Sequence, residues 1–387
     1  MENKKIRVLQ IIPDFKKGGV QADVMYPTRI LSDDDVHTDV MLFTDTVCFY
    51  EEEFSQKGNI YRIPLPNRKS KIGKVFSVFA NYFFVQQEMS RFFKAHPNYD
   101  AVHARHLHLN APCLVAAKKA GVPVRIAHCH MNRPIRKEYR DRFFVRAYLW
   151  FCSKVLMRCS THRFGVTEYA VEYMFGKGNG IVVKNPTMDL QKFDPGKHPE
   201  RDDGGIHLIV VGSYSVRKNQ MFALKVFEQL RQHVANATLT FIGYPRTASD
   251  PYLPNLKKYV QEHGLTEHVR FLPQDTNVAQ ALAESTFMLI PSKQEGLPNV
   301  ALEAQAMGVP CFVSTDVPVN CNCGICEFLA LDDGPEHWAQ EILKYAECKG
   351  TGKQYVDMTS WDNRKVCQEH LEYWRGKPME LGVESHG

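Results

Sequence analysis

The sequence has no long hydrophobic run: no stretch of about 18 or more apolar residues occurs, so a membrane-spanning helix is not expected. It also has no short repeat and no low-complexity tract, and nothing in its composition indicates large-scale disorder. The first residues, MENKKIRVLQIIPDF, contain a short apolar run but no small-residue cleavage site. They are therefore predicted to form a first strand rather than a signal peptide.

The charge balance and the cysteines argue against a nucleic-acid-binding protein and against a disulfide-rich secreted protein. A net charge of +5 and a pI of about 8.5 are too weakly basic to predict nucleic-acid binding. The 11 cysteines are odd in number and lie mostly in apolar segments, so without an export signal they are predicted to be reduced thiols of a cytoplasmic protein. The segment CNCGICEF, from Cys321 to Phe328, lacks a fourth metal ligand and is predicted to be a loop of free thiols.

What is present is the size and segment order of an α/β protein with two domains. A chain of 387 residues exceeds what one hydrophobic core usually serves. Short β-branched runs alternate with helical patterns, which predicts parallel sheets wrapped by helices. Strands are predicted at 6–12, 38–43, 59–66, 99–105, 122–130, 180–188, 206–211, 237–244, 268–274, 287–292 and 310–314, and helices at 20–31, 72–93, 111–121 and 219–233.

The pattern restarts after the middle of the chain, near Asn185 and Pro186. Two Rossmann-like parallel-sheet domains are therefore expected. Ligands in such domains bind at the carboxyl ends of the strands, so the predicted site is a cleft that the two domains face.

One short stretch, SKQEGLPNVALEAQAMGVP from Ser292 to Pro310, holds two glutamates in an unusual setting. Glu295 lies in a Gly/Pro loop after a buried strand, and Glu303 lies inside the helix predicted to begin at Pro298 or Asn299. The free N–H groups of a helix start attract anions, and a carboxylate accepts hydrogen bonds from vicinal hydroxyls. This combination favours a ligand made of sugar, phosphate and sugar. The alternative is that the helix dipole alone favours acids there.

Longer motifs carry a family resemblance. PSKQEGLPNVALEAQAMGVPCFVS, GLTEHVRFLPQDTNVAQAL, VVKNPTMDLQKF and VPVRIAHCHMN resemble segments of the retaining glycosyltransferases of family 4, which have the GT-B fold. The resemblance covers nearly the whole chain. RIAHCHMN, THRFGVTEYAVEYMFG and CEFLALDDGPEHWAQEIL resemble the capsular and exopolysaccharide branch.

The resemblance implies roles for named residues. Glu303 would hold the nucleotide ribose, Glu295 would contact the donor sugar, and Lys218 would stabilise the departing diphosphate. The catalytic residues implied are Glu295, His128 and Lys218. The donor-binding set is Glu303, Gly296, Leu297, Pro298, Asn299, Arg217, Ser213, Gly212, Gly243 and Leu272, and the acceptor and diphosphate loop holds Gly18 and Gly19.

Several residues depart from the family pattern or allow another interpretation. Ser213 stands where the family usually has arginine, and Arg217 is the candidate replacement; Asn320 stands where a glutamate is frequent. The double glycine at Gly18 is either a ligand loop or a plain turn, and it is not the G-x-G-x-x-G fingerprint of dinucleotide cofactors. A zinc site is an alternative for His106, His108, His128, Cys129 and His130, although their spacing fits no zinc pattern.

Two basic and aromatic segments, residues 67–84 and 133–158, have two interpretations. They could be amphipathic helices that pack their aromatic side chains inward. They could instead make peripheral contact with an anionic membrane. Nucleic acid would use similar residues, but no known binding motif accompanies them.

The resemblance thus implies a metal-independent retaining glycosyltransferase with no cofactor. The donor is a nucleotide sugar, with uridine favoured over guanosine, and the acceptor is a sugar or lipid-linked sugar in surface polysaccharide synthesis. The expected location is the cytoplasm or the inner face of the cell membrane. The predicted domains are 1–186 (acceptor), 187–360 (donor) and 361–387 (a helix that crosses back, and a tail).

Other functions remain open on the same residues. An epimerase would release nucleotide without any acceptor. A phosphorylase would need a pyridoxal-binding lysine, for which no motif is present. A non-catalytic sugar-nucleotide-binding subunit would bind the donor without turnover.

Overall fold

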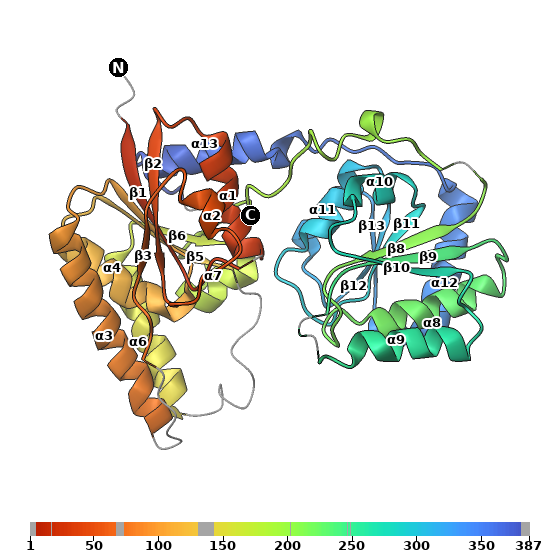
Figure 1. Ribbon diagram of the computed structural model, residues 1–387, viewed down its shortest axis with the longest axis horizontal. Coiled ribbons are helices and arrows are strands. Elements are labelled where there is room, and N and C mark those ends of the chain that lie inside the picture. Colours follow the sequence, from red (N-terminus) through yellow and green to blue (C-terminus); the bar gives the residue numbers. More distant parts are fainter. Residues whose placement is uncertain are drawn as a thin grey trace, which may run out of the picture. The chain divides into compact units, whose positions relative to one another are not determined.

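The computed structural model describes residues 5–16, 18–66, 73–130, 143–201, 203–245, 247 and 249–380. The chain divides into two compact units, and each is described by itself. Unit 1 comprises residues 1–187 and 361–387, and unit 2 comprises residues 188–360. Figure 1 shows a sheet flanked by helices in each unit.

Unit 1 contains a parallel sheet of seven strands in the order β3-β2-β1-β4-β5-β6-β7. Every pairing with a described register is parallel. The first strand, IRVLQII, is buried along almost its whole length, as a central strand covered on both faces should be. The strands are β1 (Ile6–Ile12), β2 (Val36–Leu42), β3 (Ile60–Arg62), β4 (Ala101–Ala104), β5 (Val124–Cys129), β6 (His162–Gly165) and β7 (Ile181–Val182).

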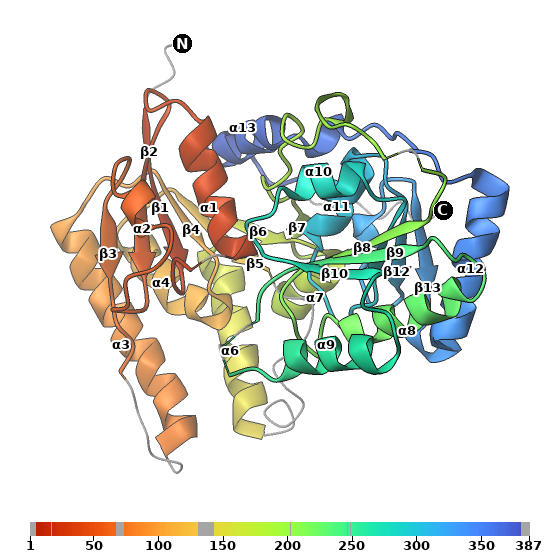
Figure 2. The same ribbon diagram turned by 45° about the vertical axis from the view of Figure 1, so that its right-hand side comes forward.

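Helices cover both faces of the unit 1 sheet. On one face, α3, α4 and α6 pack together over the apolar side chains of β1, β4 and β5, and Figure 2 shows α3 and α6 running along the same side. On the other face lie α1, α2 and α13. The helices are α1 (Gly19–Ile30), α2 (Glu51–Phe54), α3 (Gly73–Ala95), α4 (Asn110–Lys119), α6 (Phe143–Cys159), α7 (Glu168–Phe175) and α13 (Asn363–Trp374).

The last described helix, α13, belongs to unit 1 although the whole of unit 2 separates it from the rest of that unit in sequence. It contacts α1 (Figure 1), and it buries Cys367, Leu371 and Trp374 against the sheet. The sheet is therefore the middle of three layers, and α13 contributes to its core.

Unit 2 contains a parallel sheet of six strands in the order β10-β9-β8-β11-β12-β13. On one face, α8, α9 and α12 bury a core that includes Phe227, Leu256 and Trp338. The strands are β8 (His207–Val211), β9 (Thr238–Ile242), β10 (Val269–Leu272), β11 (Phe287–Ile290), β12 (Cys311–Ser314) and β13 (Cys326–Leu329). The helices are α8 (Gln220–Arg231), α9 (Tyr252–Glu262), α10 (Val278–Ala283), α11 (Asn299–Ala306) and α12 (Gly334–Lys349).

Several details differ from the sequence-based expectations; for example, the strand predicted at 180–188 is limited to Ile181–Val182. The strand predicted at 59–66 ends at Arg62, because Pro64 and Pro66 have no N–H to donate to a sheet. The loop predicted from Cys321 to Phe328 is wrong at its end, where Cys326–Leu329 is an edge strand paired with β12. The cysteines of this segment, all of them described, form no disulfide, and Cys321 and Cys326 are buried.

The two basic and aromatic segments lie partly outside the described residues, including Arg68, Lys69, Lys71 and the whole of 133–142. In the described part, Tyr82 and Tyr148 are buried, whereas Phe83 and Trp150 are 62% and 65% exposed. Inward packing therefore explains only some of the aromatic side chains. Of the helices that the structure describes, none combines the length and hydropathy that a bilayer crossing requires.

Candidate active site

The carboxyl ends of β8, β9 and β10 converge on two glycines. Gly212 donates its N–H to Ile242 O at 2.9 Å, and Gly243 donates to Leu272 O at 3.2 Å. A side chain on Gly243 would put its Cβ 2.2 Å from Gly212 O, so only glycine fits there. Gly212 has a φ of +144°, which also favours glycine. The structure thus brings Gly212, Gly243 and Leu272 together at one edge of the sheet.

The loop from Ser213 to Asn219 leads from β8 into α8 and is held by local hydrogen bonds. Ser213 O accepts from Gln220 Nε2 at 3.0 Å, and Lys218 N donates to Ser215 O at 3.0 Å. Asn219 has a φ of +57°, a left-handed conformation that turns the chain into the helix. This turn places Arg217 and Lys218 next to the loop that follows β11.

Glu295 lies between those two cations. Lys218 Nζ is 2.6 Å from Glu295 Oε1, and Arg217 Nη1 is 3.0 Å from Glu295 Oε2. Burial of Glu295, which is 7% exposed, would by itself raise the pKa of its carboxyl. Lys218 and Arg217 outweigh that effect and hold the pKa below its usual value, so Glu295 is ionised at neutral pH.

The helix after this loop starts as expected from the sequence. Pro298 precedes it without a side-chain cap, Asn299 is its first residue, and Gly308 follows its end with a φ of +69°. Among the described residues, no group forms a hydrogen bond with the buried Oδ1 of Asn299. The helix start therefore offers N–H groups and one unused amide oxygen.

Glu303 is the fifth residue of α11, and its carboxylate makes no hydrogen bond or ion pair with any described residue. Part of its surface is exposed, but surrounding protein still limits its hydration. Burial raises the pKa of Glu303 to about 7, although Lys192 and Lys218 pull it lower. Glu303 is thus a carboxylate within reach of the same lysine as Glu295, with its acceptor capacity unused.

Two contributors to this site were missed by the sequence analysis. Lys192 lies in the quoted segment VVKNPTMDLQKF but was not assigned a role, and Ser292, which hydrogen-bonds Glu295, is the first residue of the acidic motif. A single sequence contains no motif that would have linked Lys192 or Ser292 to the two glutamates. Asn320, by contrast, is exposed in a short turn before Asn322 and has no described contact with the site.

In unit 1, the predicted residues lie at the carboxyl end of the sheet. His128 is the fifth residue of β5, and Gly18 and Gly19 open α1. A Cβ on Gly19 would meet nothing within 4 Å, and one on Gly18 would meet only the flexible end of Gln21. The packing of unit 1 therefore does not require glycine at these two positions. The space beside the backbone of Gly19 is open.

The five residues of the zinc alternative do not form a metal site. Of the residues that the structure describes, no three His, Cys, Asp or Glu side chains are placed to hold a metal ion. His106 packs edge-on against Phe43, and His108 packs against Tyr148 and Tyr173. These contacts give both side chains a packing role.

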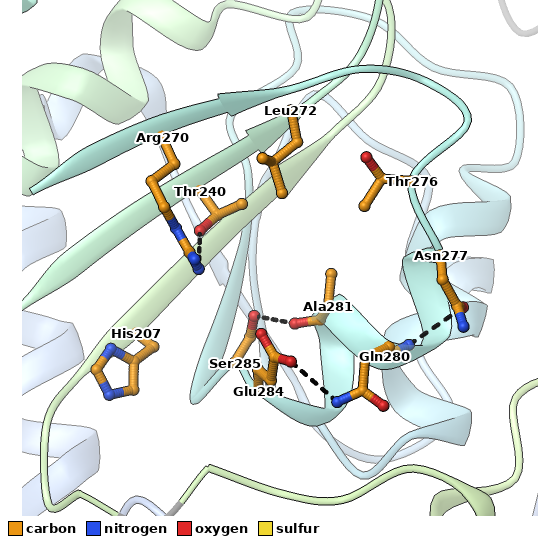
Figure 3. Close-up of a pocket in the computed structure, with 10 residues that line it drawn as sticks. All are labelled: His207, Thr240, Arg270, Leu272, Thr276, Asn277, Gln280, Ala281, Glu284 and Ser285. Carbon is orange, nitrogen blue, oxygen red and sulfur yellow. Dashed lines mark hydrogen bonds between the residues drawn. The ribbon is translucent and has the colours of Figure 1, made fainter.

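A small pocket of about 150 Å³ lies between α10 and the strands β9 and β10 (Figure 3). Of the predicted residues only Leu272 lines it, together with Arg270, which donates to Thr240 Oγ1 at 3.2 Å, and Gln280, which donates to Glu284 at 2.9 Å. Ligand pockets usually measure about 300–1,000 Å³. This pocket is too small for a nucleotide sugar and is not assigned to the donor.

Comparison with known proteins agrees with this architecture. Residues 18–185 match the family model described as glycosyl transferase 4-like domain, and residues 205–347 match that of glycosyl transferases group 1. The chain is similar to the putative glycosyltransferase EpsF of Bacillus subtilis, with 24% identity over 93% of this chain and 92% of EpsF.

Other relatives share shorter stretches. The capsular polysaccharide biosynthesis glycosyltransferase CapH of Staphylococcus aureus is 24% identical over 73% of this chain and 78% of CapH. An Escherichia coli UDP-Gal:α-D-GlcNAc-diphosphoundecaprenol α-1,3-galactosyltransferase is 25% identical over 58% of this chain and 59% of that enzyme. The crystal structure of Anabaena Alr3699/HepE in complex with UDP superposes with a TM-score of 0.67 at 14% identity, over 95% of each chain.

Two Rossmann-like parallel-sheet units and the matching family models define a glycosyltransferase of the GT-B fold. Within that class, the chain belongs to glycosyltransferase family 4.

Proposed function

We propose that the protein transfers a sugar from a nucleotide-sugar donor, with a uridine diphosphate sugar favoured, and that it retains the anomeric configuration without a metal ion. The observation that carries this proposal is the pair of glutamates in unit 2. Glu295 is ionised between Lys218 and Arg217, and Glu303 presents an unused carboxylate on α11. Glu295 with its two cations matches the sugar and diphosphate end of a nucleotide sugar. Glu303, whose carboxylate has no described partner, matches the ribose of the nucleoside end.

Each end of the donor has a partner in this arrangement. Glu303 would accept hydrogen bonds from the two ribose hydroxyls, and the free N–H groups in the first turn of α11, from Asn299 on, would face the diphosphate. Glu295 and the backbone of Gly296, Leu297 and Pro298 would contact the donor sugar. His128 of unit 1 would contribute a hydrogen bond to the same sugar.

The cations supply the charge stabilisation that the reaction needs. The bond between the sugar C1 and the diphosphate oxygen breaks, and negative charge develops on the leaving phosphate. Lys218, with Arg217 beside it, would stabilise this charge, the role for which other transferases use a metal ion. The acceptor hydroxyl forms the new bond to C1 on the same face, and its proton passes to the leaving phosphate oxygen.

The acceptor and the process are proposed from the relatives. One relative is a capsular polysaccharide glycosyltransferase, and another acts on a diphosphoundecaprenol-linked sugar. A sugar or lipid-linked sugar acceptor in surface polysaccharide synthesis is therefore the proposed acceptor class, in the cytoplasm at the inner face of the cell membrane.

The surface of α6 supports a membrane contact. Arg146, Trp150, Lys154 and Arg158 are all exposed and recur every four residues, so they form one stripe along the helix. A stripe of cations around an exposed tryptophan suits an anionic lipid surface. Such a contact would bring the enzyme to a lipid-linked acceptor.

The test is a transfer assay with UDP-sugars and lipid-linked sugar acceptors, in which UDP release and the anomeric configuration of the product are followed by NMR. We expect acceptor-dependent UDP release, an α-linked product from an α-linked donor, and equal rates with Mg²⁺ or EDTA. UDP release without acceptor would favour an epimerase. Binding without turnover over a broad acceptor panel would favour a non-catalytic subunit. An inverted product or loss of activity in EDTA would contradict the mechanism.

A further inference from the structure

Three aromatic nitrogen groups form a buried hydrogen-bonded chain in unit 1. Trp374 of α13 donates its indole N–H to His103 Nδ1 on β4 at 3.1 Å. His103 Nε2 is in turn 3.1 Å from His128 Nδ1 on β5. The two imidazole rings lie only 16° from parallel with centroids 5.3 Å apart, as two rings that share an in-plane hydrogen bond should. Trp374 is 1% exposed and both histidines are fully buried.

The chemistry of these groups fixes where each proton lies. An indole N–H can only donate, so His103 Nδ1 must be the acceptor. A neutral His103 then carries its proton on Nε2 and donates it to His128 Nδ1. A neutral His128 must carry its own proton on Nε2. The opposite arrangement would place two donors face to face between Trp374 and His103.

Both histidines are neutral at physiological pH. Burial lowers the pKa of His103 well below its ordinary value, and the nearby Arg105 guanidinium lowers it further. Burial also lowers the pKa of His128 well below its ordinary value. Repulsion between positive charges lowers it further, with contributions from His130, His103, Arg105 and His370. A protonated imidazole in either position would therefore be unfavourable, and the tautomers follow from the hydrogen bonds.

The far end of this chain has no hydrogen-bond partner in the part of the protein that the structure describes. His128 Nε2 is buried, and no described group forms a hydrogen bond with it. The ring of His130 packs against His128 with centroids 4.0 Å apart, but it offers no hydrogen bond to that nitrogen. Buried donors in native proteins almost always have acceptors, so an unused one at a strand end points to a ligand oxygen.

We propose that Trp374 and His103 are positioning residues that fix His128 as the neutral tautomer with its proton on Nε2, so that His128 donates to a substrate oxygen. Helix α13 thereby sets the proton position at a residue on a central strand. That this oxygen belongs to the donor sugar rests on the proposed function, whereas the tautomer itself does not.

The decisive experiment reads the tautomer directly. In the full-length protein labelled with ¹⁵N-histidine, long-range ¹H–¹⁵N correlation distinguishes protonated from unprotonated ring nitrogens, and His128→Gln identifies the His128 signals. We expect the wild-type protein to show His128 protonated at Nε2 alone. Trp374→Phe keeps the aromatic packing but removes the indole donor, so both tautomers should be populated in that variant.

A matched control exists in unit 2. Trp338 is also fully buried and donates its indole N–H at 2.8 Å, but to the backbone oxygen of Ala330. Trp338→Phe should leave the His128 signals unchanged. If Trp374→Phe folds poorly, two variants at His103 replace it. His103→Gln retains an N–H donor toward His128 Nδ1, so it should preserve the His128 tautomer. His103→Leu has no such donor, so both tautomers should be populated. A His128 protonated at Nδ1 in the wild type, or one indifferent to these changes, would overturn the proposal.

Kinetics then test what the tautomer is for. Loss of a donor used in the transition state should lower kcat for transfer in Trp374→Phe by about tenfold, with UDP affinity unchanged. If Trp374→Phe alters the His128 tautomer but leaves kcat unchanged, the proposed contact with substrate is refuted. The positioning of His128 by Trp374 and His103 would still stand. If the wild-type protein shows no sugar transfer, the proposed function fails, and the NMR result still decides the tautomer.

Discussion

In unit 2, the buried carboxylate of Glu295 lies between two cations, whereas in unit 1 a group of buried polar atoms around β4 and β5 has no hydrogen-bond partner among the described residues. The unpartnered atoms of that group include the nitrogens Gln10 Nε2, Arg105 Nε and Nη2, His128 Nε2 and His130 Nε2, and both carboxyl oxygens of Asp23. A paired charge is ready before any ligand arrives. An unpaired buried donor is costly until a ligand accepts from it.

This difference agrees with the different roles that we propose for the two units. Under the proposed function, the cations beside Glu295 in unit 2 would meet the diphosphate of the donor. In unit 1, the unpartnered donors around His128 would meet substrate oxygens under the same proposal. Within unit 2, Glu303 differs from Glu295, because no described residue forms a hydrogen bond or ion pair with its carboxylate; it is the group that we assign to ribose hydroxyls.

The largest expected effect on sugar transfer comes from removing Lys218, one of the two cations that pair with Glu295. Lys218→Ala leaves Glu295 buried with one remaining cation, so we expect a loss of stability of about 2 kcal/mol. Sugar transfer should fall about 100- to 1,000-fold because the leaving phosphate loses its main cation. Denaturant unfolding and steady-state rates check both values.

Arg217→Ala is the matched comparison for Lys218. The Arg217 side chain is 45% exposed, whereas that of Lys218 is 15% exposed. Its loss should cost less than about 1 kcal/mol and should slow transfer less than Lys218→Ala does. Equal effects from the two substitutions would contradict the view that Lys218 is the principal cation.

Glu303 gives the next effect, in the pH dependence of donor binding. Because the pKa of Glu303 is raised to about 7, the carboxyl must lose a proton on binding at lower pH. Affinity for UDP-glucose should therefore fall by up to about tenfold per pH unit below 7 and level off above it. UDP-glucose is the suitable ligand since it has no terminal phosphate that titrates in this range. Calorimetry at several pH values measures the profile.

The same raised pKa affects the free energy of unfolding. The folded-state value exceeds the ordinary 4.5, so the contribution of Glu303 to stability is fully present below about 4.5 and is lost as pH rises to about 7. Glu303→Gln should remove this dependence and flatten the UDP-glucose affinity profile. An affinity profile that keeps its slope in the variant would show that another group titrates.

The next prediction concerns stability alone, in unit 1 at Asp23. Burial raises the pKa of Asp23 to about 8, despite the nearby Arg105, and His130 Nδ1 lies 3.3 Å from its carboxylate. Stability should fall as pH rises from about 4 to about 8, and Asp23→Asn should be more stable than wild type at pH 9 by about 1–3 kcal/mol. Thermal unfolding of both proteins between pH 5 and 9 tests this. Parallel curves would contradict the assignment of a raised pKa.

The smallest effect lies at the surface of unit 1, where α6 carries its exposed basic and aromatic stripe. Trp150→Ser should weaken binding to vesicles of anionic lipid by about threefold to tenfold, without affecting UDP binding. Phe83, exposed on α3, provides the comparison, because Phe83→Ser lies outside that stripe. Binding to vesicles that is unchanged by Trp150→Ser would remove α6 from the proposed contact.

Much of this arrangement could be predicted from the sequence because its signals are local. Continuous apolar runs such as IRVLQII and FMLI fix buried parallel strands, and the Gly/Pro pattern around Glu295 fixes the start of α11. The strand β6, HRFG, was not predicted, because its two basic residues hide a short buried strand that only its neighbours in the sheet define.

The contacts that decide the chemistry could not be predicted in the same way. The approach of Lys218 and Arg217 to Glu295 joins loops about 80 residues apart, and the chain from Trp374 to His128 joins segments still further apart. Such contacts depend on the sheet order rather than on local sequence. The family resemblance named most of these residues, but it named neither Lys192 nor the role of Trp374.

The measurement that tests the central claim most directly is thermal stabilisation by UDP and UDP-glucose, with and without Mg²⁺. It compares the wild-type protein, Glu303→Gln and Glu336→Gln. Glu336 is exposed in the first turn of α12, so it controls for the effect of an acid near a helix start. We predict a metal-independent rise in melting temperature that is lost in Glu303→Gln and retained in Glu336→Gln. The absence of a rise in the wild type, or an equal rise in Glu303→Gln, would contradict the assignment of unit 2 as the donor site.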